Sequence, residues 1–179
     1  YRPGHLKNFC QYCPAGYSQD TTGKDFCNSC GIGTFAAVAG LTVCDKCEKG
    51  KGHTETVQTT PSACDFCDPG KYSTLAHDIC ENCPAGYFQN FPGADMCKNC
   101  PAGSSSSESG VMACTDCDPG EYQDVESQKS CKKCGLGQYT TQKKQIECAK
   151  CVAGKYQDQN DQASCKPCDT GRYTNETGL

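Results

Sequence analysis

The side chains with the clearest potential for chemistry are cysteines, which number 20 among 179 residues. They form ten Cys-x-x-Cys pairs, and in all ten a glycine follows the second cysteine by three residues. The first cysteines are 17, 17, 20, 16, 17, 17, 17, 17 and 17 residues apart, which indicates a tandem repeat. The pairs are Cys10/Cys13, Cys27/Cys30, Cys44/Cys47, Cys64/Cys67, Cys80/Cys83, Cys97/Cys100, Cys114/Cys117, Cys131/Cys134, Cys148/Cys151 and Cys165/Cys168.

Three kinds of thiol chemistry compete for these pairs. The spacing is close to that of four-cysteine zinc sites, but ten pairs would need five metals and the spacers lack a basic recognition surface. A redox-active Cys-x-x-Cys needs one pair at a helix start, not ten equivalent copies. The chain has only three Ile, five Leu, six Val and no Trp, so it cannot build one apolar core. We therefore predict structural disulfides in an oxidising, extracellular or cell-surface location.

The pairing of the cysteines is left open by the sequence. A bond within one pair is usually labile, so three schemes remain. In a ladder, the second cysteine of one pair bonds to the first of the next, as in Cys13–Cys27, and Cys10 and Cys168 are left for partners outside this sequence. A nested scheme adds Cys10–Cys30 to Cys13–Cys27, and a crossed scheme joins Cys10 to Cys27 and Cys13 to Cys30.

The segments that must position the cysteines are short and polar. They lack a 3.6-residue apolar period, and their glycines suit tight turns with positive φ. We predict an extended rod of about ten 17-residue units, with two- to four-residue strands, little or no helix and no single hydrophobic core. The array should run through residues 1–179, with units starting near 10, 27, 44, 64, 80, 97, 114, 131, 148 and 165. Tyr1 and Tyr173 fit the aromatic position of incomplete units, so we expect the sequence to begin and end inside a repeat.

A weaker period of 34 residues is superimposed on the 17-residue one. After the glycine, units one, five, seven and nine carry Gln-Asp or Gln-Asn, and units four, six, eight and ten carry Ser or Thr. This alternation predicts that two units form one module. The third unit, with three extra residues around 54–61, should break the pattern. The Gln positions are Gln19, Gln89, Gln123 and Gln157.

The run Cys-Pro-Ala-Gly-Tyr at 13–17 and again at 83–87 resembles the ephrin-receptor-like cysteine-rich repeat. That group is similar in style to the repeats of tumour-necrosis-factor receptors, and the resemblance extends through all ten units. It implies an extended rod outside the cell, as in receptors, matrix proteins, protist surface proteins and flagellar-hair proteins, and it carries no catalytic residue. The units at Cys30, Cys47 and Cys168 depart from Cys-Pro-Ala-Gly.

Modification and metal binding have few candidates. Asn175-Glu176-Thr177 is an N-glycosylation sequon, and Ser104–Ser107 with Ser109 could carry O-linked sugar or form a solvated loop. His5, His53 and His77 are isolated, so we expect surface histidines and no metal site. The acidic run at 158–161 lacks the ligand spacing of a calcium loop.

Apolar residues gather once, at 35–43, which makes this stretch the candidate contact patch. Its members are Phe35, Val38, Leu41 and Val43. The recurring aromatic residues two places after the glycines are expected to cover neighbouring disulfides. They are Phe35, Tyr72, Phe88, Tyr122, Tyr139, Tyr156 and Tyr173.

Composition and charge exclude several functions. The net charge is −4 without a basic stripe, which disfavours nucleic acid, and no apolar run is long enough to span a membrane. No catalytic constellation or cofactor motif occurs, so we predict that the chain is not an enzyme and needs no cofactor. The sequence favours a structural segment of a surface appendage, filament or matrix fibre that associates with itself or with other extracellular proteins. The alternative is a receptor ectodomain that binds a protein ligand or acts as a spacer; only two Arg in the chain weaken it.

Overall fold

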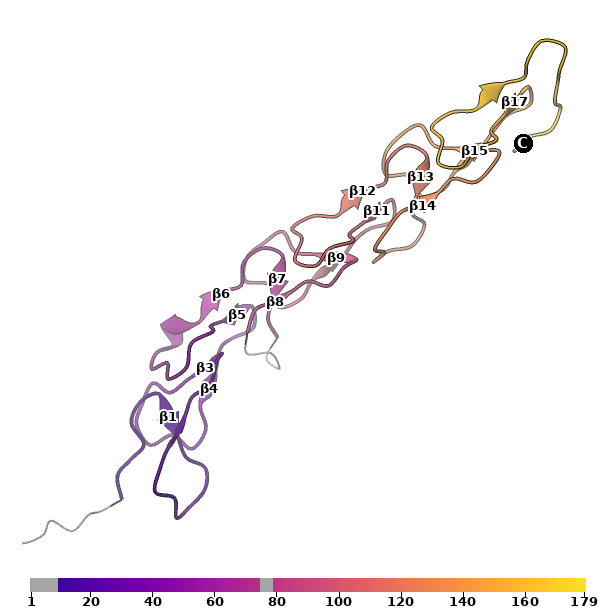
Figure 1. Ribbon diagram of the computed structural model, residues 1–179. Coiled ribbons are helices and arrows are strands. Elements are labelled where there is room, and N and C mark those ends of the chain that lie inside the picture. Colours follow the sequence, from indigo (N-terminus) through magenta and orange to yellow (C-terminus); the bar gives the residue numbers. More distant parts are fainter. Residues whose placement is uncertain (1–9, 75–78) are drawn as a thin grey trace, which may run out of the picture. The chain divides into compact units, whose positions relative to one another are not determined.

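The computed structural model describes residues 10–74 and 79–179 (Figure 1). Tyr1, His5 and His77 lie outside the described residues. The chain divides into two compact units. Unit 1 comprises Tyr1–Cys67 and Ser73–Cys80, and unit 2 comprises Asp68–Tyr72 and Glu81–Leu179.

Both units are built from antiparallel hairpins whose strands have fixed positions in the repeat (Figure 1). One strand is the two residues after the glycine, and the other is the x-x of the next Cys-x-x-Cys pair. Unit 1 contains β1 (Tyr17–Ser18) with β2 (Asn28–Ser29), β3 (Thr34–Phe35) with β4 (Asp45–Lys46), and β5 (Lys51–Gly52) with β6 (Asp65–Phe66). Unit 2 contains β7 (Lys71–Tyr72) with β8 (Glu81–Asn82), β9 (Tyr87–Phe88) with β10 (Lys98–Asn99), β11 (Ser104–Ser105) with β12 (Thr115–Asp116), β13 (Glu121–Tyr122) with β14 (Lys132–Lys133), β15 (Gln138–Tyr139) with β16 (Ala149–Lys150), and β17 (Lys155–Tyr156) with β18 (Lys166–Pro167).

Helix is almost absent from the part of the chain that the structure describes. Its one helical segment is the 3₁₀ turn η1 (Pro61–Ala63), which lies in the long third repeat. Turns and irregular backbone connect the two-residue strands, as the polar, glycine-rich spacers indicate. The prediction of a small disulfide-rich repeat with short strands and little helix is confirmed. That all ten units form one continuous rod stays a prediction.

The interior is made of sulfur instead of aliphatic side chains. Among the described residues, Ala36 is the one buried apolar side chain that is not a cysteine. The second cysteine of each of the first nine pairs is buried, with exposed fractions from 0% to 8%, whereas the first cysteines beyond Cys10 are half-buried. Buried disulfides therefore take the place of a hydrophobic core, which so little Ile, Leu and Val could not supply.

Successive repeats are joined by backbone hydrogen bonds at equivalent positions. In eight repeats the glycine N–H donates to a carbonyl in the next repeat, at 2.7 to 3.0 Å between nitrogen and oxygen. The same glycine's carbonyl accepts from the second cysteine of that next repeat, as in Cys134 N to Gly120 O at 2.8 Å. Because these bonds use main-chain groups, they recur whatever the side chains are.

Gly120 shows why the repeat needs glycine at this point. Its φ is +91°, a conformation that L residues with a side chain rarely adopt. A Cβ at Gly120 would also lie 2.6 Å from the carbonyl carbon of Asp161, which belongs to a turn two repeats further along. The glycine thus allows a turn and a close backbone contact at the same time.

Candidate functional site

The disulfides follow the ladder among the three schemes that the sequence left open. The second cysteine of each pair is bonded to the first cysteine of the next pair, with Cα–Cα distances of 5.4 to 5.8 Å. Cys10 and Cys168, also expected as disulfide cysteines, have no sulfur partner, because this sequence holds no cysteine at the position where the ladder would place one. The bonds are Cys13–Cys27, Cys30–Cys44, Cys47–Cys64, Cys67–Cys80, Cys83–Cys97, Cys100–Cys114, Cys117–Cys131, Cys134–Cys148 and Cys151–Cys165.

The glutamines of the 34-residue period brace their own loops, and all of them except the half-buried Gln19 are buried. Gln123 is 2% exposed; its Nε2 donates to Ser130 O at 2.8 Å, and its Oε1 accepts from the Val125 N–H at 3.2 Å. One side chain therefore links the middle of the loop that Cys117–Cys131 closes to the residue just before Cys131. Gln19, Gln89 and Gln157 make the same two bonds, to residues seven and two places further along. The sequence showed their period but not their role.

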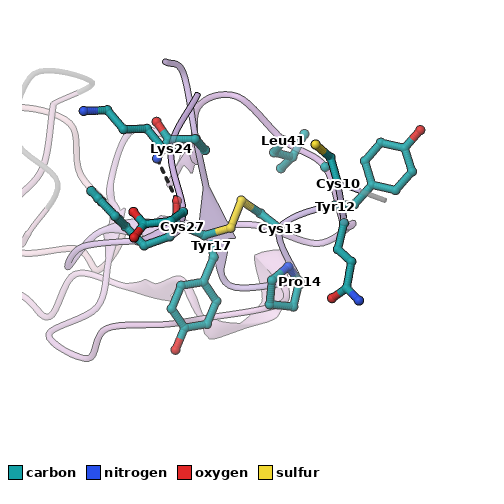
Figure 2. Close-up of a pocket in the computed structure, with 13 residues that line it drawn as sticks. Cys10, Tyr12, Cys13, Pro14, Tyr17, Lys24, Cys27 and Leu41 are labelled. Carbon is teal, nitrogen blue, oxygen red and sulfur yellow. Dashed lines mark hydrogen bonds between the residues drawn. A yellow bond between two sulfur atoms is a disulfide. The ribbon is translucent and has the colours of Figure 1, made fainter. Parts of the chain in front are cut away.

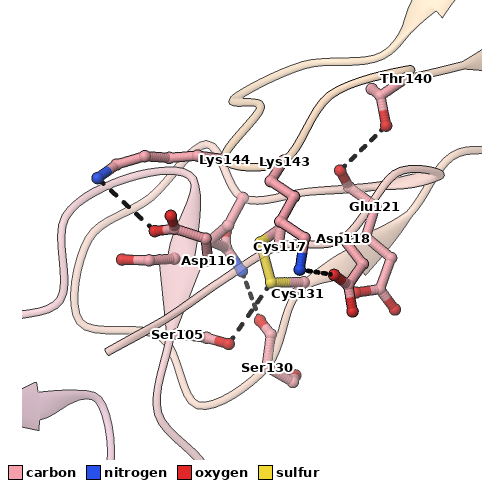
Figure 3. Close-up of a disulfide and its surroundings, with 12 residues drawn as sticks. Ser105, Asp116, Cys117, Asp118, Glu121, Ser130, Cys131, Thr140, Lys143 and Lys144 are labelled. Carbon is pink, nitrogen blue, oxygen red and sulfur yellow. Dashed lines mark hydrogen bonds and ion pairs between the residues drawn. A yellow bond between two sulfur atoms is a disulfide. The ribbon is translucent and has the colours of Figure 1, made fainter. Parts of the chain in front are cut away.

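In the fourth, sixth, eighth and tenth repeats, serine or threonine occupies the equivalent position, three residues after the glycine, whereas the second repeat has Ala36 there. Thr140 is 4% exposed, and its Oγ1 accepts from the Gly120 N–H at 2.8 Å while donating to Glu121 O at 3.3 Å (Figure 3). Ser73 and Ser106 are likewise buried there. From the fourth repeat on, this position thus alternates between a short hydroxyl residue and a glutamine that bonds within its own repeat.

His53 occupies this same position in the third repeat. Gly50 precedes it by three residues, as Gly120 precedes Gln123. This position holds neither a glutamine nor a hydroxyl residue, so the third repeat departs from the alternation, as the sequence predicts. The three extra residues enter later in the loop, where η1 lies, and leave the position of His53 after Gly50 unchanged.

His53 bonds differently from the glutamines. Its Nδ1 accepts from the N–H of Gly33, in the preceding repeat, at 3.4 Å. In eight other repeats that glycine N–H donates to a backbone carbonyl instead. The Nε2 atom of His53 is buried and has no hydrogen-bond partner within the described structure.

The sulfurs of Cys47 and Cys64 lie within 4.8 Å of a His53 ring nitrogen and of each other, a grouping that could suggest a metal site. The two sulfurs are bonded to each other in a disulfide, however. Thiolates, not disulfide sulfurs, are zinc ligands. The arrangement is a histidine packed beside a disulfide.

Lysines brace the hairpins of unit 2 from outside. Lys132 Nζ lies 2.5 Å from Asp124 Oδ1 and 5.8 Å from the centroid of the Tyr122 ring. The hydrogen bond from Lys132 lowers the pKa of Asp124 below its ordinary value. Lys166 repeats this arrangement with Asp158, whose pKa it lowers in the same way.

Opposite charges also join neighbouring repeats. Lys133 Nζ lies 2.6 Å from Asp161 Oδ2, and this hydrogen bond raises the pKa of Lys133 above its ordinary value. One repeat earlier the polarity is reversed, since Lys144 Nζ lies 3.6 Å from Asp116 Oδ1 (Figure 3). The acidic run at 158–161 thus has lysine partners at both ends, Lys166 on Asp158 and Lys133 on Asp161.

The residues of the proposed contact patch are only partly accessible. Val38 and Val43 are exposed, at 59% and 67%, whereas Phe35 and Leu41 are half-buried. Leu41 forms one wall of a surface hollow of about 590 Å³ beside the Cys13–Cys27 disulfide (Figure 2). The other lining residues include Cys10, Tyr12, Tyr17 and Phe26.

The candidate modification sites differ in accessibility. Asn175 is exposed, so its sequon can be reached. Ser104, Ser105 and Ser106 are buried, with Ser104 Oγ donating to Pro101 O at 2.8 Å. The expectation of an O-glycosylated or solvated serine loop is therefore wrong for these three residues, which are packed inside the repeat.

The repeats of this chain match a known protein family. A family model described as tyrosine-protein kinase ephrin type A/B receptor-like matches residues 70–112, 103–145 and 142–178. Each match contains two Cys-x-x-Cys pairs, in agreement with the two-repeat alternation. No curated protein matches the chain. Among the described residues, no helix is long and apolar enough to cross a membrane.

Proposed function

Because this chain belongs to the ephrin type A/B receptor-like family of cysteine-rich repeats, we propose that it is a structural segment of an extracellular appendage, filament or matrix fibre. The family and the nine disulfides indicate a disulfide-rich module of the cell exterior. The finer assignment, a self-associating structural role, rests on how the repeats are joined.

The observation that carries the proposal is that main-chain groups link the repeats. The Gly120 N–H donates to Thr140 O in the next repeat, and the Gly120 Cα lies close to the backbone of Asp161 in the repeat after that. Equivalent contacts recur along unit 2. A scaffold bonded in this way sets its length by copy number and leaves the outer side chains free to vary. Those properties suit a protein that spans distance.

Lateral association would use the apolar side chains that the scaffold leaves outside. Val38 and Val43 of the contact patch are examples, since each exposes more than half of its surface. Disulfide-linked repeats cannot bury such residues internally, because their interior is already filled with sulfur and small polar side chains. Contact with a second copy would remove them from water.

The test is electron microscopy and sedimentation of the oxidised protein, with and without Val38→Asp together with Val43→Asp. We expect the native chain to form fibres or lateral assemblies and the double variant to sediment as single chains. The matched control is Leu136→Asp together with Val152→Asp, at two exposed apolar positions outside the patch. Its assembly should be unchanged.

Two results would overturn the proposal. Native protein that remains as single chains at high concentration would remove the self-association. Assemblies equally unaffected by both double variants would remove the patch as the contact surface.

The second candidate is a receptor ectodomain region that binds a protein ligand. The hollow beside Cys13–Cys27 favours it, because Tyr12, Tyr17 and Phe26 line one concave surface and aromatic side chains are enriched in protein-binding sites (Figure 2). Discrete, unassembled chains in the microscope, together with loss of a bound protein in Tyr12→Ala, would favour this candidate over the first.

A further inference from the structure

We propose that His53 makes the joint between the second and third repeats sensitive to pH, in a scaffold whose other joints are not. At this joint the Gly33 N–H donates to His53 Nδ1 at 3.4 Å. At eight others the equivalent N–H donates to a backbone carbonyl, as Gly103 N does to Gln123 O at 2.7 Å. A carbonyl accepts at every pH, whereas an imidazole nitrogen accepts only while it is unprotonated.

The loop geometry explains why a histidine acts in this way here. In the regular repeats the brace glutamine reaches the carbonyl seven residues on, just before the next cysteine. In the third repeat η1 intervenes, so the carbonyl before Cys64 belongs to Ala63, ten residues after His53. The side chain at this position bonds to the preceding repeat instead of to its own loop.

Protonation changes what His53 can do. The neutral ring that accepts at Nδ1 carries its hydrogen on Nε2, which is buried without a partner. The protonated ring has two donors and no acceptor, so the bond from Gly33 is lost. Histidine is the side chain that ordinarily changes charge between pH 5 and 8.

Two kinds of charged group occur near His53 in the repeat. Some accept hydrogen bonds from other side chains, and the others lie on the strands before and after the loop. Glu48 accepts from Lys51 Nζ at 2.9 Å, and Glu55 accepts from Gln58 Nε2 at 3.1 Å. The Cys47–Cys64 disulfide beside the ring does not titrate. Strands β4 and β6 add Asp45, Lys46 and Asp65.

The structure offers an internal reference for the experiment. Amide exchange of the ¹⁵N-labelled, oxidised chain should be measured at pH 7.5 and pH 5.0, and each rate converted to a protection factor. Gly33 reports the histidine joint, and Gly103 reports a joint made by backbone groups alone. We expect the protection of Gly33 relative to Gly103 to fall roughly three- to tenfold at pH 5.0, as loss of one hydrogen bond implies.

Two variants make the result decisive. His53→Asn keeps an acceptor close to the position of Nδ1 but does not titrate, so its Gly33 protection should be the same at both pH values. His53→Ala removes the acceptor, so its Gly33 protection should be low at both. The midpoint of the Gly33 change should also coincide with that of the His53 ring proton resonances.

A constant ratio of Gly33 to Gly103 protection in the native chain would overturn the proposal. A fall that persists in His53→Asn would do so as well, because the pH response would then come from another group. If His53→Ala does not fold, the comparison of the native chain with His53→Asn still decides the question.

Discussion

The seventh and third repeats of this protein share one scaffold but differ in the loop that it holds. In the seventh, the bonded Cys117 and Cys131 are 14 positions apart in the sequence, and a buried glutamine braces the loop. In the third, Cys47 and Cys64 are 17 positions apart, and the loop has a 3₁₀ turn and a histidine in place of the glutamine. The Cα–Cα distance across both disulfides is nevertheless 5.7 Å.

The difference teaches that cysteines and glycines set the frame and that the loop between them can change. In both repeats the hairpin pairs the residues after glycine with the x-x of the next pair. The turn that contacts the repeat's upstream neighbours survives in the third repeat at Val57, whose φ of +61° is unusual for a β-branched residue. Val57 N still donates to Cys30 O at 2.9 Å, as Asp161 N does to Cys134 O at 3.0 Å.

Removal of the disulfides should have the largest effect and should treat the two repeats alike. Replacing Cys117 and Cys131 with alanine is expected to cost about 3 kcal/mol of unfolding free energy, because it frees a loop of this size in the unfolded chain. The Cys47 and Cys64 pair should cost nearly the same, since the dependence on loop length is logarithmic and amounts to about 0.2 kcal/mol here. Denaturant unfolding under oxidising conditions measures both. A difference above about 1 kcal/mol would show that the third repeat does not share the scaffold.

Substitution of the framework glycines should separate backbone strain from packing. Gly120→Ala and Gly154→Ala both place alanine at positive φ, at +91° and +80°, which costs about 1 to 2 kcal/mol. Only at Gly120 does the new Cβ meet the backbone of another repeat; nothing lies within 4 Å at Gly154. We therefore expect Gly120→Ala to lose about 2 kcal/mol more than Gly154→Ala in denaturant unfolding. Equal losses would mean that the contact with Asp161 is unimportant.

The side chain three residues after the glycine should contribute more to the free energy of unfolding in the seventh repeat, where it is Gln123, than in the third, where it is His53. Gln123→Ala leaves the Ser130 carbonyl and the Val125 N–H without partners and is expected to cost about 2 kcal/mol. His53→Ala removes a single bond of 3.4 Å and should cost less. The exposed Gln142→Ala is the control and should stay within about 0.5 kcal/mol of the native chain. A larger loss for His53→Ala than for Gln123→Ala would reverse the comparison.

The charge pairs between repeats should have the smallest effect, because their members are largely exposed. Lys133→Asp and Asp161→Lys should each lower the thermal midpoint slightly, and the double exchange should restore it. Asp161 has a φ of +65°, and a lysine is tolerated at that turn position in the preceding repeat, where Lys144 has a φ of +64°. Failure of the exchange to recover the loss would mean that the pair does not help to align the two repeats.

The pH dependence of a charge pair is opposite for its lysine and its aspartate, as Lys133 from the pair with Asp161 and Asp124 from the pair with Lys132 show. Lys133 has a raised pKa, so its contribution is present below its ordinary value of 10.5 and lost as the pH rises through the higher, folded value. Asp124 has a lowered pKa, so its contribution is present above 3.8 and lost as the pH falls through the lower, folded value. Both windows lie outside pH 5 to 8, so thermal midpoints of Asp124→Asn and the native chain should differ by a constant amount there.

The frame could be predicted from the sequence because cysteine and glycine act through the backbone. Ten glycines at one position indicate a backbone requirement, and the structure adds the close approach to a turn two repeats away. The glutamine period was visible, yet its role was not, because a buried brace needs a loop whose ends are known. His53 was expected to be a surface histidine, because the sequence does not show the Gly33 N–H that lies beside its ring. Ser104–Ser106 were misjudged because serine runs usually lie in solvent.

Disulfide mapping of the oxidised protein tests the account most directly. Proteolysis without reduction, followed by mass spectrometry, identifies which cysteine-containing peptides are linked. Cys117–Cys131 occurs in both the ladder and the nested scheme, so Cys134 decides between them. The structure predicts a peptide that links Cys134 to Cys148. A peptide that links Cys134 to Cys114 or to Cys117 would contradict the ladder. It would also contradict the common scaffold of the third and seventh repeats.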